Sequence, residues 1–503
     1  MPSVSQAVLL SWSVPPAASF ALALTALIYL RGWFLLRRAG VPFVPGWRAI
    51  SFQLGLLTLW AALASPLDTF SGFLITAHML QHMLLMMVAP PLLLLGAPLI
   101  PLVRGLPVFA RREFAGPFLN WRLAQRVGAA LTNLWVALIL MGVAMFAWHT
   151  PRLYELALAS SSWHEFEHAC FFFASLIFWW PVVQPWPSPT RAPRWAAVPY
   201  LLVADLQNTI LSAILVFSDR VLYPSYAKMP RLFGLSAMQD QAASGAIMWV
   251  VGSMAFIVPA VMIAFQSLSG SSSSMQLVRS IIEQECAPEL FSSSRSQARR
   301  LIRGHLMEAV VFAALFAAAG FSLALLASRP SDDDDQALRM TKTMGAFEAS
   351  MFAVPELVKG SNSIAVLVQD SVTHDVQLGV AVELRARQPN GGEQTMPIRA
   401  SAEESDNKLL RSAEVDFSGV GDWLLSVAVR RGSESAEFTL PLQVAPPEHG
   451  SAVPWSYVWL LTLAAILCFA YIRRHRQEPI PPDAIFARAP ETGRDLELTG
   501  RDR

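Results

Sequence analysis

Apolar residues occur along the chain in long runs that are separated by short polar stretches. A run of roughly 17 to 25 apolar residues is long enough to cross a bilayer as a helix. Such runs lie near residues 15–36, 49–66, 71–96, 127–148, 163–183, 196–217, 242–265, 305–327 and 454–472. The pattern therefore predicts a polytopic α-helical membrane protein with about nine transmembrane helices.

A different pattern occupies the region from about 343 to 446. Here short stretches such as SIAVLVQD and GDWLLSVAVRR alternate between polar and apolar residues, and Gly, Asn, Asp and Pro separate them. This alternation with frequent turn residues is typical of antiparallel strands in small two-sheet domains. We expect a small Ig-like antiparallel β-sandwich between the last two spans.

These patterns predict six parts along the chain. They are a seven-helix membrane domain at 1–265, a cytoplasmic loop at 266–304, transmembrane helix eight at 305–327, an acidic linker and β-sandwich at 328–453, transmembrane helix nine at 454–472, and a tail at 473–503. The tail is rich in Pro, Arg and acidic residues, a composition that predicts disorder.

The sidedness of the membrane domain is predicted by the basic residues of its short loops. Arginines are concentrated after spans one, three, five and seven, and the intervening loops hold few. Loops rich in Lys and Arg stay on the cytoplasmic side. The N-terminus and the β-sandwich are thus expected outside and the C-terminal tail inside.

Composition agrees with a membrane protein and excludes several classes. Hydrophobic residues make up 54% of the chain and charged residues 15%, whereas a soluble protein carries about a quarter charged residues. A net charge of +1 and the absence of a basic stripe argue against nucleic-acid binding. Three cysteines without a CxxC motif leave no disulfide framework. The start of the chain lacks a basic region, so the first span is predicted to be an uncleaved anchor.

Five histidines gather at the predicted outer ends of three spans. Two pairs have i,i+4 spacing, which places both members of a pair on one helix face. Ionisable residues are rare inside apolar spans and usually mark a functional site there. The histidines are His78 and His82, His149, and His164 and His168; the carboxylates on the same side are Asp68, Glu155, Glu165, Glu167 and Asp240.

Imidazoles in this arrangement predict a metal or haem site. Neutral imidazole binds copper, zinc or iron, and thioether ligands favour Cu(I). Met79 and Met86 lie within about a quarter-turn of the His78 face, so they and Asp240 are candidate additional ligands. The alternative for any one histidine is a hydrogen-bonded packing role. No nucleophile–base arrangement accompanies the histidines, and WHEFEH differs from the HExxH of zinc proteases, so we do not expect an enzyme.

A second polar face lies in the sixth span. Asp205, Asn208, Thr209 and Ser212 share one side of an otherwise apolar helix. A carboxylate at such depth costs roughly 2.5 to 3.5 kcal/mol on insertion scales, so this side should face the bundle. Interhelical hydrogen bonding and a proton or ion role both fit the pattern.

Four motifs resemble a known family. HMLQHMLLMMVAPPLLLLGAP, FAWHTPRLYELAL, HEFEHACFFFASLIFWWPVV and MQDQAASGAIMWV, in this order over about residues 15–265, are similar to the multi-span CtaG-type cytochrome c oxidase assembly factors. The resemblance implies a bacterial plasma-membrane protein that helps to assemble a haem–copper oxidase, with oxidase subunits and periplasmic copper chaperones as partners. It also implies that the five histidines and Asp240-Gln241 are recurrent positions.

The region after span eight resembles the small periplasmic YtkA or FixH type of β-domain, on the stretches ELVKGSNSIAVLVQD and GDWLLSVAV. Three functions are in competition. The first is an assembly factor that binds copper and delivers it to the oxidase. The second is a membrane electron carrier in which two histidines ligate haem. The third is a copper transporter, which would need polar groups through the whole bilayer.

Overall fold

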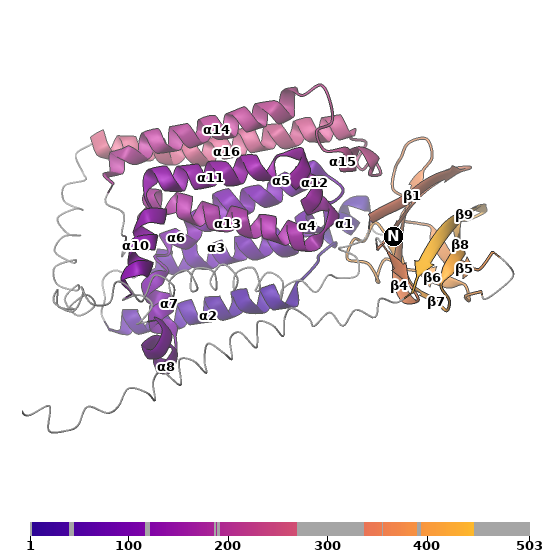
Figure 1. Ribbon diagram of the computed structural model, residues 1–503, viewed down its shortest axis with the longest axis horizontal. Helices are drawn as coiled ribbons and strands as arrows, with labels where there is room; N and C mark the ends of the chain where they lie inside the picture. The colour runs from indigo at the N-terminus through magenta and orange to yellow at the C-terminus, as the bar shows by residue number, and fades with distance from the viewer. Residues whose placement is uncertain are drawn as a thin grey trace, which may run out of the picture. The chain divides into compact units, whose positions relative to one another are not determined.

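The computed structural model describes residues 3–39, 45–115, 121–185, 188, 192–268, 337–354, 356–389 and 394–446. They form a helical part up to residue 268 and a β part from residue 337 (Figure 1). The predicted spans at 305–327 and 454–472, the cytoplasmic loop and the tail lie outside the described residues.

The helical part contains long helices joined by short ones. In chain order these are α1 (Val4–Leu9), α2 (Pro16–Arg38), α3 (Gly46–Ala64), α4 (Pro66–Ser71), α5 (Ile75–Met83), the π-helix η1 (Leu84–Val88), α6 (Ala89–Leu95), α7 (Leu99–Gly105), α8 (Val108–Ala110), the π-helix η2 (Arg111–Ala115), α10 (Arg122–Leu131), α11 (Leu134–Trp148), α12 (Pro151–Ala159), α13 (Ser161–Val183), the 3₁₀ helix η3 (Arg194–Ala196), α14 (Ala197–Phe217), α15 (Pro224–Lys228) and α16 (Ala237–Leu268).

Six helical segments among the described residues are long and apolar enough to cross a membrane, or seven if one bent pair counts as a span. The six are Pro16–Arg38, Gly46–Ala64, Ile75–Leu95, Ser161–Val183, Arg194–Phe217 and Ala237–Leu268. Each coincides with a predicted span. The membrane character of the chain is thereby supported, whereas a total of nine spans and their sidedness stay predictions.

The fourth predicted span, 127–148, is not one straight helix. It is broken between α10 and α11, whose axes differ by 68°. Asn133 causes the break, because its side chain accepts hydrogen bonds from the backbone amides of Trp135 and Val136 and so starts a new helix. The prediction from apolar length missed this cap.

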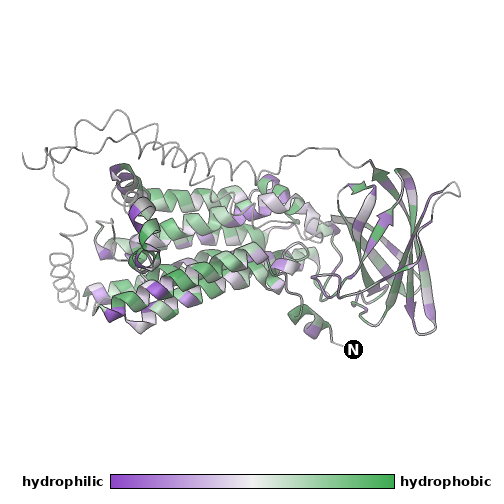
Figure 2. Ribbon diagram, turned by 90° about the horizontal axis from the view of Figure 1, so that it is seen from below, coloured by the Kyte–Doolittle hydropathy of each residue, from purple (hydrophilic) through white to green (hydrophobic). Residues whose placement is uncertain are grey.

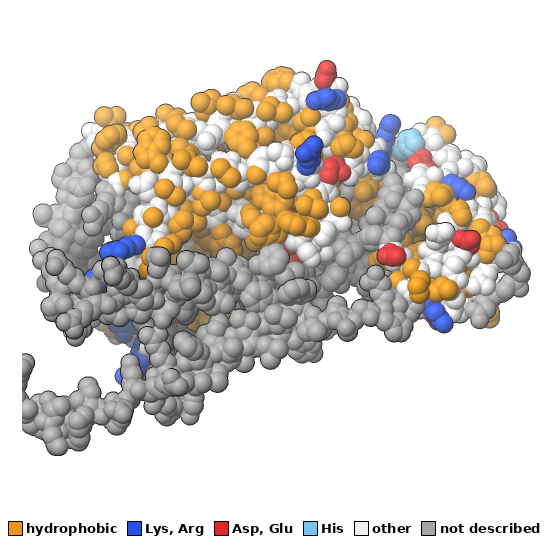
Figure 3. All heavy atoms as spheres, viewed as in Figure 1, with side chains coloured by type: hydrophobic (Ala, Val, Ile, Leu, Met, Phe, Trp, Pro, Cys, Tyr) orange, Lys and Arg blue, Asp and Glu red, His pale blue; other side chains and the backbone are white. Residues whose placement is uncertain are grey.

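Apolar side chains cover the outside of the helical part, as expected for a surface that faces lipid. Leu24, Leu57, Ile139, Val250 and Phe265 are all exposed. Figure 3 shows that hydrophobic side chains dominate the visible face of this part and that charged ones lie toward its ends. The ribbon coloured by hydropathy in Figure 2 shows the same apolar character along the long helices.

Glycines permit a very close contact between α2 and α7. A Cβ atom on Gly32 would lie 1.8 Å from the carbonyl oxygen of Pro101, and one on Gly105 would lie 1.8 Å from that of Ile28. A Cβ atom at either position would therefore collide with the backbone of the other helix, so both positions require glycine.

The β part consists of two sheets. The strands are β1 (Ala337–Met344), β2 (Phe347–Ala353), β3 (Leu357–Val358), β4 (Gly360–Asp370), β5 (Ala381–Arg387), β6 (Ile398–Ala400), β7 (Arg411–Phe417), β8 (Gly421–Arg431) and β9 (Glu434–Ala445). One sheet has the order β1-β2-β4-β7 and the other β3-β9-β8-β5-β6, and all pairs are antiparallel except β3 with β9.

One apolar core joins the two sheets, as in a sandwich. It includes Phe347 and Val415 from the first sheet with Val382, Trp423 and Phe438 from the second. The predicted C-terminal β-domain is thus present. It starts earlier than the alternation at 343 indicated, because β1 pairs with β2 across the turn at Gly345, whose φ is 61°.

Candidate metal centre

His78 and His82 lie on α5 and are completely buried. The start of α5 is capped from α16: Asp240 Oδ2 accepts a hydrogen bond from the amide of Ile75 (2.7 Å) and Oδ1 accepts one from that of Thr76 (3.1 Å). The carboxylate thereby satisfies two amides that a helix start leaves unpaired. The structure thus places Asp240, a predicted candidate ligand, at the cap that positions the two histidines.

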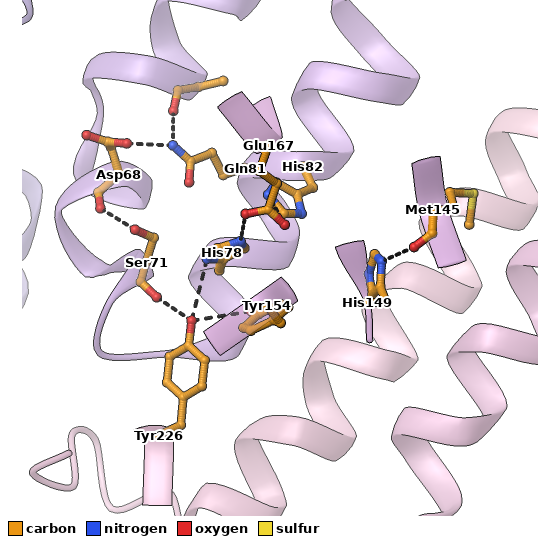
Figure 4. A network of polar contacts seen from close by, with 11 residues as sticks. Asp68, Ser71, His78, Gln81, His82, Met145, His149, Tyr154, Glu167 and Tyr226 are labelled. Atoms are coloured by element: carbon orange, nitrogen blue, oxygen red, sulfur yellow. Dashed lines mark hydrogen bonds and ion pairs between the residues drawn. The ribbon is translucent and has the colours of Figure 1, made fainter. Parts of the chain in front are cut away.

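The partner of α5 in this site is α13, which carries His164, Glu167 and His168 on one side. Glu167 is 1% exposed, and its carboxylate lies between the two α5 imidazoles (Figure 4). Its Oε2 atom is 3.6 Å from Nε2 of His78, and its Oε1 atom is 3.9 Å from Nε2 of His82. These three side chains offer ligand atoms that all lie within 4.8 Å of one another, as a metal site requires.

Four imidazoles from the two helices lie close together beside Glu167. The ring centroids of His78 and His82 are 4.2 Å apart, and those of His164 and His168 are 4.1 Å apart. The pairs also meet each other, with centroid distances of 5.0 Å between His78 and His164 and 5.4 Å between His82 and His168. The two predicted i,i+4 pairs are therefore brought together.

The ligand atoms of this group are buried without hydrogen-bond partners. Burying a polar atom without a partner is unfavourable, and native proteins rarely leave several such atoms together. The unpartnered atoms are Nε2 of His78, His82, His164 and His168 and both carboxylate oxygens of Glu167. A bound cation would satisfy the carboxylate and the imidazole lone pairs at once.

His149 is the C-cap residue of α11 and lies apart from Glu167, His78 and His82 in Figure 4. Its Nδ1 atom is 2.8 Å from the carbonyl oxygen of Met145. A carbonyl only accepts, so Nδ1 carries the proton and Nε2 has the free lone pair. That Nε2 atom is buried and unpartnered. A ring nitrogen held by a carbonyl with the other one free is the usual arrangement of a metal-ligating histidine.

The candidate thioether ligands Met79 and Met86 lie in the apolar core of the helical part. Met86 belongs to the π-helix η1, which directly follows α5. A π-helix releases a carbonyl from the regular ladder, and the Met86 carbonyl accepts hydrogen bonds from Ser175 Oγ and from Trp179 Nε1 (3.0 Å) on α13. These bonds hold η1, and through it the end of α5, against α13.

Three tyrosines, absent from the predicted site, lie beside the imidazoles. The hydroxyl of Tyr226 donates to the carbonyl of Ser71 (2.7 Å) and is 3.5 Å from Nδ1 of His78. Tyr154 lies beside the ring of His78 and stacks on Tyr223. Burial raises the pKa of Tyr154 and Tyr226 well above the ordinary phenol value, so both keep their protons.

Residues 27–269 match the sequence family described as cytochrome c oxidase caa3 assembly factor. That segment belongs to the caa3 assembly factor family. The resemblance found from the four motifs is thereby confirmed, with nearly the same boundaries. All five histidines, Glu167 and the three tyrosines lie within the caa3 assembly factor segment, and the β part lies after it.

Two uncharacterized mycobacterial proteins are similar to the chain. The match to the Mycobacterium leprae protein is 26% identical over 234 residues and covers 46% of this chain and 35% of that protein. The match to the Mycobacterium bovis protein is 26% identical over 262 residues and covers 52% of this chain and 40% of that protein. The chain thus spans well under half of these relatives. No solved structure matches it.

The polar face of the sixth predicted span lies on α14 of the caa3 assembly factor segment. Asn208 is buried and its Nδ2 atom donates to the carbonyl of Met248 on α16 (3.1 Å). Ser212 is also buried, and its hydroxyl and Asp205 Oδ1 have no hydrogen-bond partner. Interhelical hydrogen bonding therefore accounts for Asn208.

Proposed function

We propose that this protein helps to assemble a haem–copper cytochrome c oxidase by binding a copper ion at His78, His82 and Glu167 and delivering it to an oxidase subunit. The observation that supports the proposal best is the set of buried, unpartnered ligand atoms around one carboxylate. The link to the oxidase is supported by residues 27–269, which match the caa3 assembly factor family. The protein acts as a binding and transfer protein, and no catalytic step is required.

The chemistry of the pocket favours Cu(I) as the cargo. Imidazole is a good ligand for copper, and methionine-rich surroundings favour the soft monovalent ion. A single carboxylate also balances the charge of one Cu(I), whereas a divalent ion would leave a net positive charge in an apolar surrounding, which is costly. His164, His168 and His149 then serve as further ligands during loading and release.

The proposed setting is the bacterial plasma membrane, with the histidine end of the bundle and the β-domain on the periplasmic side. Arginines are concentrated in the predicted cytoplasmic loops. From this side the pocket would receive copper from a periplasmic chaperone and pass it to an oxidase subunit. The β-domain would serve as a docking module for one of these partners.

Metal analysis of the purified full chain tests the proposal. Loaded anaerobically with Cu(I), the wild type should retain about one ion per chain, and the double variant His78→Ala/His82→Ala should retain almost none. His374→Ala is the control, because His374 lies in the β part, where it pairs with Glu348. A wild type that binds no copper, or shows a Soret band from haem instead, contradicts the proposal.

A deletion strain tests the assembly step. Loss of the protein should lower the copper content and activity of the oxidase, and added copper should restore both in part. Unchanged oxidase copper in the deletion strain would show that the protein does not deliver copper.

A further inference from the structure

The α15 segment, defined as residues 218–236 between α14 and α16, lies against the candidate metal centre. Its two tyrosines, Tyr223 and Tyr226, are both buried although they belong to a connecting segment. The Tyr226 hydroxyl reaches the carbonyl of Ser71, the hydroxyl of Tyr154 (3.3 Å) and Nδ1 of His78 (3.5 Å), as Figure 4 shows. This connecting segment therefore touches a proposed copper ligand directly.

Tyr223 contacts the backbone of a further predicted ligand, His149. Its hydroxyl donates to the backbone carbonyl of His149 (3.1 Å), and its ring stacks on Tyr154 with a centroid distance of 3.8 Å. The two tyrosines thus connect the α15 segment to α5 and to the end of α11, the positions of two predicted ligands.

The α15 segment is held mainly by side-chain hydrogen bonds. Ser225 donates to Glu155 through its amide (3.1 Å) and its hydroxyl, and the amide of Leu222 donates to Oε1 of Gln241 (2.7 Å). Its only helix, α15, has five residues. Elements with few backbone bonds of their own open locally at lower cost than long packed helices.

An ion at His78 and His82 needs an opening, because both side chains are fully buried. The ligands lie on α5 and α13, two helices fixed to each other by the Met86 carbonyl. Moving either would break the packing of long helices, whereas moving the α15 segment breaks side-chain hydrogen bonds and exposes the buried side chains of Tyr223, Tyr226 and Leu232.

We propose that the α15 segment is the gate of the copper pocket and that Tyr226 is a positioning residue for His78. The inference rests on the proposed function. Closed, the segment shields the ion; displaced, it lets the ion pass to or from a partner.

Tyr226 also determines which ring nitrogen of His78 carries the proton. Its own hydroxyl proton goes to the carbonyl of Ser71, so its oxygen is free to accept from Nδ1–H of His78. With the proton on Nδ1, the lone pair on Nε2 is directed toward Glu167 and the ion. Such outer contacts orient ligating histidines and tune their affinity.

The rate of copper removal by a water-soluble Cu(I) chelator, bathocuproine disulfonate, tests the gate. Tyr226→Phe and Tyr223→Phe should release Cu(I) about tenfold faster than the wild type, as expected for the loss of about 1.4 kcal/mol. Tyr200→Phe is the matched control. The hydroxyl of Tyr200 also donates to a backbone carbonyl, that of Phe178, but Tyr200 lies on α14 and not in the α15 segment. Its release rate should equal that of the wild type.

A second measurement needs no metal. Diethyl pyrocarbonate modifies accessible unprotonated imidazoles, and mass spectrometry locates the product. His78 and His82 should react several-fold faster in Tyr226→Phe and in the milder variant Ser225→Ala, which loosens the segment without touching the pocket. Both variants should elute like the wild type on size-exclusion chromatography.

The outcomes separate the two proposals. Wild-type release rates and wild-type histidine reactivity in all gate variants would overturn the gate while the copper site stands. A wild type that binds no copper would overturn the proposed function, and the histidine reactivity would then decide for or against the gate by itself.

Discussion

The carboxylate of Glu167 is located between the imidazoles of His78 and His82, 3.6 Å from one Nε2 atom and 3.9 Å from the other. These are too long for hydrogen bonds and are distances that a small ion between the groups would bridge. Glu167 is therefore central to the site, and several consequences of the structure can be measured.

Glu167→Gln should separate copper affinity from folding stability. The variant should bind Cu(I) about 100-fold more weakly, because it loses the one anionic ligand of the group. The metal-free protein should melt at the same temperature or higher, since a buried carboxylate without a hydrogen bond is replaced by a neutral amide. A competition titration and a thermal melt in detergent measure the two effects.

The control for this variant is Asp416→Asn, which removes an exposed charge from β7. It should change neither quantity. Wild-type copper affinity in Glu167→Gln would remove this residue from the ligand set.

The double variant Ser175→Ala/Trp179→Phe should destabilise the bundle and weaken copper binding. It leaves the buried Met86 carbonyl without its two donors, which costs about 1 to 3 kcal/mol. The melting temperature measures the first effect and a copper titration the second. Trp180→Phe is the control, because the indole of Trp180 donates to Ser188 at a partly exposed position. Equal melting temperatures for both variants would contradict this role of the carbonyl.

Gly105→Ala should lower stability by about 1 to 3 kcal/mol, the usual cost of overpacking. The added Cβ would collide with the backbone oxygen of Ile28, which no side-chain movement relieves, so α2 and α7 must separate. Gly128→Ala on α10 is the matched control, since its Cβ meets nothing within 4 Å and alanine favours the helix. Thermal melts of both variants should therefore shift in opposite directions.

Trp423→Ala should unfold or strongly destabilise the β part, by about 3 to 5 kcal/mol. The indole is 1% exposed, packs edge-on against Phe417, and donates to the carbonyl of Gly419 (3.0 Å). Limited proteolysis of the full chain should then release fragments from the β part first. Val372→Ala, at an exposed position, should leave the digestion pattern unchanged.

Much of the site was predictable because helical spacing is a local property. His78 and His82, and likewise His164 and His168, share a face through the i,i+4 relation, and the apolar runs showed which segments cross the membrane. Glu167 lies three residues after His164, on the same side, so its position was visible in the sequence. Whether Glu165 or Glu167 faces the α5 histidines depends on the rotation of α13 relative to α5, which only the structure shows.

Other features depend on contacts between distant residues. Tyr226 is 148 positions from His78 in the chain, and nothing in its surroundings marks it as part of a site. Asp240 was predicted as a candidate ligand, but its capping of α5 joins residues more than 160 positions apart and was not predicted. The break at Asn133 depends only on neighbouring residues, so it could have been predicted. The apolar residues on both sides of it nevertheless have the pattern of one continuous span.

The π-helix η1 has a consequence for the comparison of related chains. A segment of this kind arises when one extra residue is inserted into an α-helix. The wide turn takes up that residue, so the helical segments before and after it keep the faces they would have in a continuous α-helix. Leu93, which packs against Gly55 of α3, would therefore keep this neighbour in a related chain that is one residue shorter between 84 and 88. A one-residue gap here in an alignment is therefore compatible with the same bundle geometry, with both histidine pairs still facing the same neighbours.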